Sequence, residues 1–322
     1  MSHYVKISTL GPRPLPAGNS PLSQTDVDRM IAFWRYELSQ VMPDCPDLIV
    51  LPEACDRFSG PSSADHAYYR VRGNQMRDLF RDIARQRHCH IAYSAIREAP
   101  DGTWRNSTQL IGRDGEILGI YNKNHTVITE TTEQGTLCGR EAPIITCDLG
   151  RVACAICFDL NFDELRLHYA AARPDLILFS SMYHGGLMQT YWAYSCRAHF
   201  VSAVAGLPCN VVSPVGQVLA SSTNYLDHVT TTVNLDCRVV HLDFNWEHLR
   251  ALKAKYGRGV SIYDPGYLAS VLVSSETEGI SVDEMIREFN IELLDDYMAR
   301  SLAHQHDPTH IEPPPPFTKE SR

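Results

Sequence analysis

Three residues that could carry out covalent chemistry together follow predicted strands of this 322-residue sequence. Glu53 and Lys123 each come just after a strand pattern, and Cys157 directly follows the apolar run 151–156. A thiolate can attack a polarised carbon, a carboxylate can accept and return the proton, and an ammonium group can stabilise the anionic intermediate. The three residue types therefore suit nucleophilic catalysis, provided that the fold brings them together.

Cys157 lies where a strand pattern gives way to a helix pattern. The run 151–156 is typical of a strand buried on both faces, and Asp163 and Glu164 begin a helical pattern. The N–H groups and the positive dipole at the start of that helix are expected to lower the pKa of the thiol and to support a developing oxyanion. Cys157 is therefore the candidate nucleophile, and the alternative is a buried structural cysteine.

Glu53 and Lys123 are predicted at the carboxyl ends of strands. Residues 48–51 form an apolar run that Pro52 ends, and residues 116–121 form the second strand of a hairpin with Asp-Gly in its turn. In open α/β sheets, ligands and catalytic groups lie at the carboxyl ends of the strands. Taken alone, each residue could also be a solvated loop or edge side chain.

Strand and helix patterns alternate along the part of the chain that must position these residues. The resulting order is β-α-β-α-β-ββ-β-α-β-α-β-β-β, and it predicts an α/β fold of mixed sheets covered by helices rather than a purely parallel sheet. Apolar residues at helical spacing recur in the segments 23–41, 66–87, 163–173 and 187–199.

The character of the chain changes after Trp246, where helical patterns separated by loops follow one another. We therefore predict a catalytic domain over residues 1–245, a helical extension over 246–307 and a Pro-rich tail over 308–322. Histidines near the tail could in principle bind a metal, but no metal site is predicted. These histidines are His304, His306 and His310.

The bulk composition bounds the class of protein. A net charge of −9 argues against nucleic acid and anionic membranes as partners, and no apolar run reaches the roughly 20 residues that span a bilayer. The first residues read as a strand rather than as a signal peptide. The ten cysteines are expected to be thiols, and we expect a cytoplasmic location.

Two other classes of chemistry fit the sequence less well. No Gly-x-Ser-x-Gly segment occurs, which argues against a serine hydrolase of the nucleophile-elbow type. Cys154 and Cys157 form a Cys-x-x-Cys pair that could indicate zinc or redox chemistry. Their odd separation places the two side chains on opposite faces of a strand, and no second pair completes a zinc site.

Several segments together resemble the nitrilase (carbon–nitrogen hydrolase) superfamily. The three signature segments are similar to Leu-Pro-Glu at 51–53, Tyr-Asn-Lys at 121–123 and the segment 157–165, and further similarity covers 196–198 and 213–220. The motifs occur in the family's order over about residues 4–240. The resemblance implies a four-layer α-β-β-α sandwich, here followed by the C-terminal helical extension, whose subunits pair as a homodimer or a higher homo-oligomer.

The resemblance also implies the role of each residue. Glu53 would be the general base, Lys123 the cation that stabilises the intermediate, and Cys157 the nucleophile, with the backbone N–H of Phe158 completing the oxyanion hole. A second glutamate would bind the lysine; Glu130 matches best by spacing, and Glu133 is the alternative. The implied reaction needs neither a metal nor an organic cofactor.

The substrate is less well defined. The position four residues after the cysteine is Asn161, where relatives that act on carboxylate-bearing substrates often have arginine, so a carboxylate clamp is not expected there. Tyr183 and His184 are expected in the pocket-lining loop, although His184 could simply bond a backbone carbonyl. Small amides are the favoured substrates. Nitrile or N-carbamoyl hydrolysis by the same residues, or an inactive relative that acts as a binding or scaffold subunit, are the alternatives.

Overall fold

The computed structural model describes residues 2–18, 20–60 and 66–313. The chain forms two compact units: residues His3–Leu235 form one, and the described residues from Asp236 onward, together with Ser2, form the other. The division lies ten residues before the predicted domain boundary at residue 245. The last residues of the predicted tail, 314–322, lie outside the described residues.

Two six-stranded sheets form the first unit, and both are mixed, as predicted. The first sheet has the order β12 (His228–Asn234), β1 (Tyr4–Leu10), β2 (Leu48–Val50), β3 (His90–Glu98), β4 (Trp104–Ile111) and β5 (Ile117–Asn122). The second has the order β11 (Val218–Ser221), β10 (Asn210–Val212), β9 (His199–Val204), β8 (Leu176–Ser181), β7 (Gly150–Ile156) and β6 (Ile145–Cys147).

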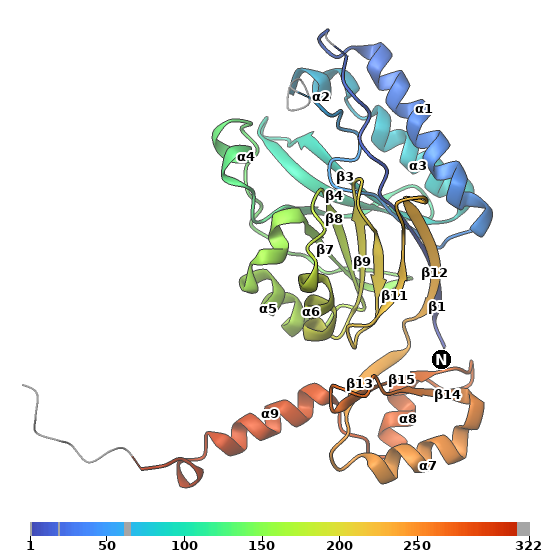
Figure 1. Ribbon diagram of the computed structural model, residues 1–322, viewed down its shortest axis with the longest axis vertical. Coiled ribbons are helices and arrows are strands. Elements are labelled where there is room, and N and C mark those ends of the chain that lie inside the picture. Colours follow the sequence, from blue (N-terminus) through green and yellow to red (C-terminus); the bar gives the residue numbers. More distant parts are fainter. Residues whose placement is uncertain (1, 19, 61–65, 314–322) are drawn as a thin grey trace, which may run out of the picture. The chain divides into compact units, whose positions relative to one another are not determined.

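Helices cover the outer faces of both sheets (Figure 1). The helices α1 (Gln24–Val41), α2 (His66–Arg72) and α3 (Gln75–Arg87) pack on the first sheet, and α5 (Asp163–Ala172) and α6 (Leu187–Cys196) pack on the second. A continuous apolar core fills the space between the sheets, because alternate side chains of each strand point inward. The predicted four-layer α-β-β-α sandwich is confirmed.

The second unit contains strands as well as the predicted helices. Its sheet has the order β13 (Cys237–His241), β15 (Ser270–Ser275) and β14 (Val260–Tyr263). Its helices are α7 (Trp246–Tyr256), α8 (Val282–Glu288) and α9 (Leu294–Gln305). Val240, Leu252 and Val273 belong to its apolar core. None of these strands was predicted, because each is too short for a periodic pattern to distinguish it from the loops around it.

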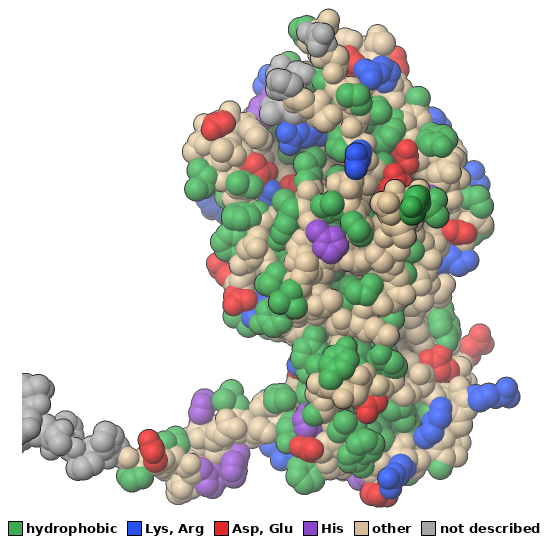
Figure 2. Space-filling model, in the orientation of Figure 1, with side chains coloured by type: hydrophobic (Ala, Val, Ile, Leu, Met, Phe, Trp, Pro, Cys, Tyr) green, Lys and Arg blue, Asp and Glu red, His purple; other side chains and the backbone are tan. Residues whose placement is uncertain are grey.

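Acidic and basic side chains are interspersed over the face shown in Figure 2. Within the described residues, no helix has both the length and the apolar character needed to cross a bilayer.

Candidate active site

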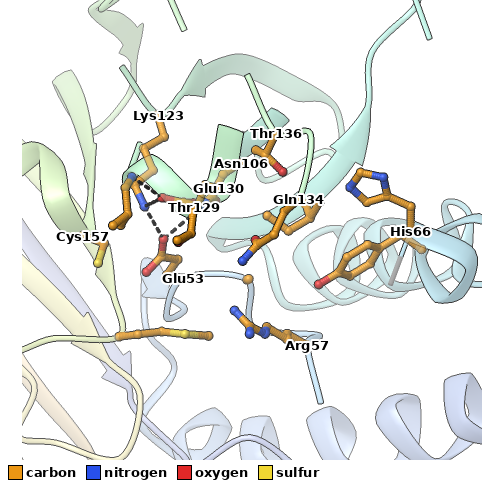
Figure 3. A pocket seen from close by; sticks show the side chains of 15 residues that line it. Glu53, Arg57, His66, Asn106, Lys123, Thr129, Glu130, Gln134, Thr136 and Cys157 are labelled. Carbon is orange, nitrogen blue, oxygen red and sulfur yellow. Dashed lines mark hydrogen bonds and ion pairs between the residues drawn. The ribbon is translucent and has the colours of Figure 1, made fainter. Parts of the chain in front are cut away.

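The ends of three strands bring the predicted residues together. Strand β5 runs parallel to β2, because β2 pairs parallel with β3 and two antiparallel pairings then lead to β5. Glu53, after β2, and Lys123, after β5, therefore lie at the same edge of the first sheet. Cys157 directly follows β7 of the sheet that packs against it. All three residues line one cavity of about 230 Å³ (Figure 3).

Lys123 is the centre of the polar contacts in this cavity. Its side chain is 1% exposed, and its Nζ donates to Glu53 Oε1 at 2.9 Å and to Glu130 Oε2 at 2.8 Å. Burial disfavours the ammonium charge, but the carboxylates of Glu53 and Glu130 outweigh that effect and raise the pKa of Lys123. Lys123 is therefore a permanent cation at neutral pH.

Glu130 is held in place by the start of a short helix, α4 (Ile128–Thr132). The backbone N–H of Val127 donates to Glu130 Oε2 at 2.7 Å. The carboxylate therefore accepts hydrogen bonds both from a backbone donor at the helix N-terminus and from Lys123. Glu133, the alternative considered for this role, follows the same helix with an exposed side chain and does not line the cavity.

Cys157 occupies a strained backbone position. Its φ of 50° is left-handed, which costs a non-glycine residue roughly 1–3 kcal/mol and is typical of functional sites. Cys157 begins the 3₁₀ helix η3 (Cys157–Asn161), and this turn separates it from the start of α5. The thiol lies beside Glu53 and Lys123 (Figure 3).

The expectation of a lowered thiol pKa is wrong. Burial and the negative charge of Glu53 raise the pKa of Cys157 to about 12, and the opposing effects of Lys123 and of the Met182 backbone are smaller. The α5 dipole cannot reverse this, because η3 stands between the thiol and the helix N-terminus and the dipole acts only over about one turn. The resting thiol is protonated and needs a base.

This protonation state predicts how Cys157 reacts with an alkylating agent. Because the thiolate is the reactive form, the rate of iodoacetamide labelling at Cys157 should rise about tenfold per pH unit between pH 7 and 9.5 without a plateau. Peptide-level mass spectrometry resolves this site from the other cysteines, and Cys157→Ser identifies its signal. A rate that is already constant above pH 7.5 would contradict the raised pKa.

Asn106, in β4, is a member of the site that the sequence analysis missed. Its Nδ2 donates to Glu53 Oε1 at 2.8 Å and to Glu130 Oε1 at 3.3 Å, so one amide joins both carboxylates. Strand register could have revealed it, because Ser107 pairs with Asn122 and thereby brings Asn106 next to Lys123. The backbone N–H of Lys123 also donates to the Asn106 carbonyl at 2.8 Å.

Substitution of Asn106 should therefore reduce activity without removing a reacting group. Asn106→Leu removes a hydrogen bond to a charged group, which is typically about 1.5–3 kcal/mol, and should lower kcat/KM about 10- to 100-fold. Asn106→Asp keeps the shape of the side chain but adds a third carboxylate to the site. Its kcat/KM, measured by steady-state kinetics, should therefore be lower than that of Asn106→Leu. The reverse order would contradict the role of the amide as a donor to Glu53 and Glu130.

Asp159 connects the cysteine turn to the lysine loop and was also missed as a site residue. This fully buried carboxylate accepts hydrogen bonds from the Ile156 N–H at 2.9 Å and from Tyr121 Oη at 2.7 Å. Its other oxygen accepts from the His125 N–H at 2.8 Å and contacts His125 Nδ1 at 3.0 Å. The positions of Cys157 and Lys123 thus depend on one side chain.

Asp159→Asn is expected to destabilise this connection. An amide places two donors where donors already converge, so the free energy of unfolding should fall by about 1–3 kcal/mol in urea titrations. Glu164→Gln, at an exposed position of the same segment whose side chain makes no hydrogen bond or ion pair within the described residues, is the control and should change stability by less than about 0.5 kcal/mol. Equal effects of the two substitutions would contradict the role of Asp159.

The remaining predicted pocket residues lie outside the cavity lining. Asn161 is exposed and donates to the Phe158 carbonyl at 3.0 Å. Tyr183 packs against the core between the sheets, and His184 accepts from the Gly186 N–H at 3.2 Å. Of that loop, Met182 lines the cavity instead. Arg57 and His66 line the side of the cavity away from Cys157 (Figure 3).

Comparison with known proteins identifies the family of this chain. The sequence model of the family described as carbon–nitrogen hydrolase matches residues 30–284, which extends past the segments recognised from the sequence alone. The chain therefore belongs to the carbon–nitrogen hydrolase family, and the predicted membership in the nitrilase superfamily is confirmed.

Curated relatives are distant in sequence. Human deaminated glutathione amidase is 22% identical, over 54% of this chain and 62% of its own length. The chloroplastic omega-amidase of Arabidopsis thaliana is 25% identical, over 58% of this chain and 56% of its own length. The matches thus cover only about half to three-fifths of these relatives.

Solved structures show the same fold at low identity. Saccharomyces cerevisiae Nit3 is 17% identical with a TM-score of 0.58, and the alignment covers 72% of this chain and 90% of Nit3. The Caenorhabditis elegans NitFhit protein is 15% identical with a TM-score of 0.62, over 89% of this chain and 98% of that protein. At these identities the likeness establishes the fold.

Proposed function

We propose that the protein hydrolyses the carbon–nitrogen bond of a small amide through a thioester on Cys157. The observation that carries this proposal is the meeting of Glu53, Lys123 and Cys157 at one cavity. The family and the amidase names of its relatives support the same reaction class. The cavity volume of about 230 Å³ favours a small substrate.

The first half of the proposed reaction forms the thioester. Glu53 accepts the thiol proton of Cys157, and the sulfur attacks the amide carbon. The amide oxygen becomes an oxyanion, which Lys123 Nζ and the Phe158 N–H stabilise; the first N–H groups of a helical turn have no partner within that turn. The C–N bond then breaks, and Glu53 returns the proton to the leaving amine.

The second half releases the acid. Water transfers a proton to Glu53 and attacks the thioester carbon, and the same oxyanion donors stabilise the second intermediate. The C–S bond breaks, the carboxylic acid leaves, and the Cys157 sulfur regains its proton from Glu53. The Glu130 carboxylate keeps Lys123 charged and positioned throughout. No step needs a metal or an organic cofactor.

Covalent trapping with a substrate panel tests this proposal. The purified protein is incubated with small aliphatic amides, nitriles and N-carbamoyl amino acids, and intact-mass spectrometry follows an acyl adduct that is absent from Cys157→Ala. Release of ammonia with an adduct from amides supports the proposal. Turnover of nitriles or carbamoyl compounds alone selects those alternatives. If Cys157 is alkylated normally but no compound is turned over, the result favours the alternative that the protein is an inactive relative acting as a binding or scaffold subunit.

We also propose that the protein is cytoplasmic and forms a homodimer or a higher homo-oligomer. All ten cysteines are thiols, as in a reducing compartment. Large apolar side chains are exposed on α5 and α6, including Leu167, Leu187 and Tyr191, and their burial against a second copy would stabilise a dimer. Light scattering after size-exclusion chromatography measures the molecular mass. A monomeric mass at every concentration of a 10-fold dilution series would contradict oligomerisation.

The site residues all belong to the first compact unit. We accordingly propose that catalysis lies within the predicted domain 1–245, of which residues 236–245 belong to the other compact unit, and that residues 246–307 form an accessory extension, with the Pro-rich tail after them. The partner of the catalytic unit is then a small amide, nitrile or ureido compound, and neither nucleic acid nor a membrane is required.

A further inference from the structure

A second cavity, of about 420 Å³, lies on the outer face of the first sheet beside α2 and α3. Arg70, Arg72, Arg77 and Arg97 line it, together with a single acidic residue, Glu98. Such a local excess of positive charge is notable in a chain with a net charge of −9. The proposed reaction uses none of these side chains.

Three of the four arginines have carboxylate neighbours. Arg72 is buried and pairs with Asp56 at 2.8 Å, so its charge belongs to the core. At the edge of the cavity, Arg77 is 3.3 Å from Asp78. Arg70 is 4.0 Å from Glu98, and both side chains are largely exposed, so this contact is weak.

Arg97 differs because both of its hydrogen-bond acceptors are neutral. Its Nε donates to Ser107 Oγ at 3.0 Å, and its Nη2 donates to Asn122 Oδ1 at 3.0 Å. A guanidinium has five N–H donors, and in the described part of the chain the others of Arg97 have no acceptor. A half-buried cation with unused donors is a suitable anchor for an oxyanion, which guanidinium binds in a bidentate manner.

The surroundings increase the cost of the Arg97 charge. Burial and the neighbouring Arg105 both act to hold the pKa of Arg97 below its usual range. The exposed carboxylate of Asp101 offsets this only in part, because it is shared with Arg105 at 3.7 Å. A bound anion would remove this repulsion without any change in the fold.

We propose that this cavity binds a small oxyanion, a phosphate or carboxylate group of a metabolite, with Arg97 as the anchor and Arg70 and Arg77 at the rim. Gly73 and Asn74 also line the cavity just before α3, so the first N–H groups of that 13-residue helix add to the positive potential. The site is separate from the cavity of Cys157, although Tyr69 lines both.

Calorimetric titration with inorganic phosphate, at constant ionic strength kept with potassium chloride, tests the proposal on the full chain. Saturable binding at one site is expected, and Arg97→Gln should weaken it about 10- to 100-fold, because a hydrogen bond to a charged group is typically about 1.5–3 kcal/mol. Arg85→Gln, on the far part of α3 and outside the cavity, makes the same charge change and should bind phosphate as the wild type does.

Thermal unfolding keeps the test independent of folding defects. Without phosphate, Arg97→Gln should unfold close to the temperature of the wild type, because the loss of the hydrogen bonds to Ser107 and Asn122 is offset by the removal of a charge that burial and Arg105 disfavour. With phosphate, only the wild type and Arg85→Gln should gain stability. Arg97→Lys keeps the positive charge but loses the planar pair of N–H donors with which a guanidinium binds an oxyanion. This variant should therefore bind phosphate with an affinity between those of the wild type and Arg97→Gln. Parallel titration with malonate shows whether phosphate or carboxylate groups are preferred.

The outcomes are distinct. Saturable binding of either anion that depends on Arg97 and not on Arg85 supports the site. Absence of saturable binding of both anions to the wild type, or equal affinities of the wild type and Arg97→Gln, overturns it. Neither result depends on whether the protein hydrolyses amides.

Discussion

Cys157→Ala should abolish turnover while the fold remains intact. The sulfur is the only atom of the site proposed to bond the substrate carbon, so kcat/KM should fall by at least about 10⁴-fold, since loss of a nucleophile leaves only binding and oxyanion stabilisation. Alanine is small enough for the space and shares the left-handed backbone cost of cysteine, so stability should change by less than about 1 kcal/mol.

Two further variants make this prediction sharper. Cys157→Ser keeps a nucleophilic atom but one that is much harder to deprotonate, so it should be nearly as inactive as alanine. Cys154→Ala, three residues earlier in the buried part of β7, is the matched control and should retain the acyl adduct. Full activity of Cys157→Ala with an unchanged melting temperature would refute the nucleophile assignment.

Lys123→Ala should reduce both activity and stability. Loss of an oxyanion donor typically costs about 10²–10³ in kcat, and the displacement of Glu53 would add to that loss. In addition, the carboxylates of Glu53 and Glu130 would be left facing each other without their cation. Breaking a buried ion pair by removing one partner typically lowers the free energy of unfolding by about 3–5 kcal/mol.

A double variant separates the two effects of Lys123. Lys123→Met with Glu130→Gln removes one cation and one anion, so it should recover much of the stability in urea titrations and yet stay inactive. Glu133→Gln in place of Glu130→Gln is the control, because the Glu133 side chain is exposed and should give no recovery. Recovery of activity together with stability would show that Lys123 is structural rather than catalytic.

The strand-terminal positions of the reactive residues could be predicted because local signals define them. Apolar runs and turn residues indicate strands that end before Glu53, Lys123 and Cys157, and the alternation of strands and helices indicates the sandwich. Membership of the family could be recognised from the same segments. The spacing also favoured Glu130 over Glu133, in agreement with its contact with Lys123.

Other features depend on contacts that sequence reasoning cannot see. The raised pKa of the Cys157 thiol depends on burial and on a carboxylate from the other sheet, whereas the local pattern pointed to a nearby helix dipole. The role of Asn106 depends on the register between β4 and β5. Strand β13 gains its partner β15 only after α7 and β14 intervene in the chain, and the cluster of arginines around Arg97 arises only when α2 and α3 pack beside β3.

By itself, the sequence determined the chemical types of the reactive side chains and the strands that present them, because strand boundaries follow from local apolar and turn patterns. The tertiary structure alone decided their charges and contacts. Lys123 and Glu53 are 70 residues apart in the chain and 2.9 Å apart in space. Electrostatic interactions depend on distance and burial, and both are set by the packing of the two sheets.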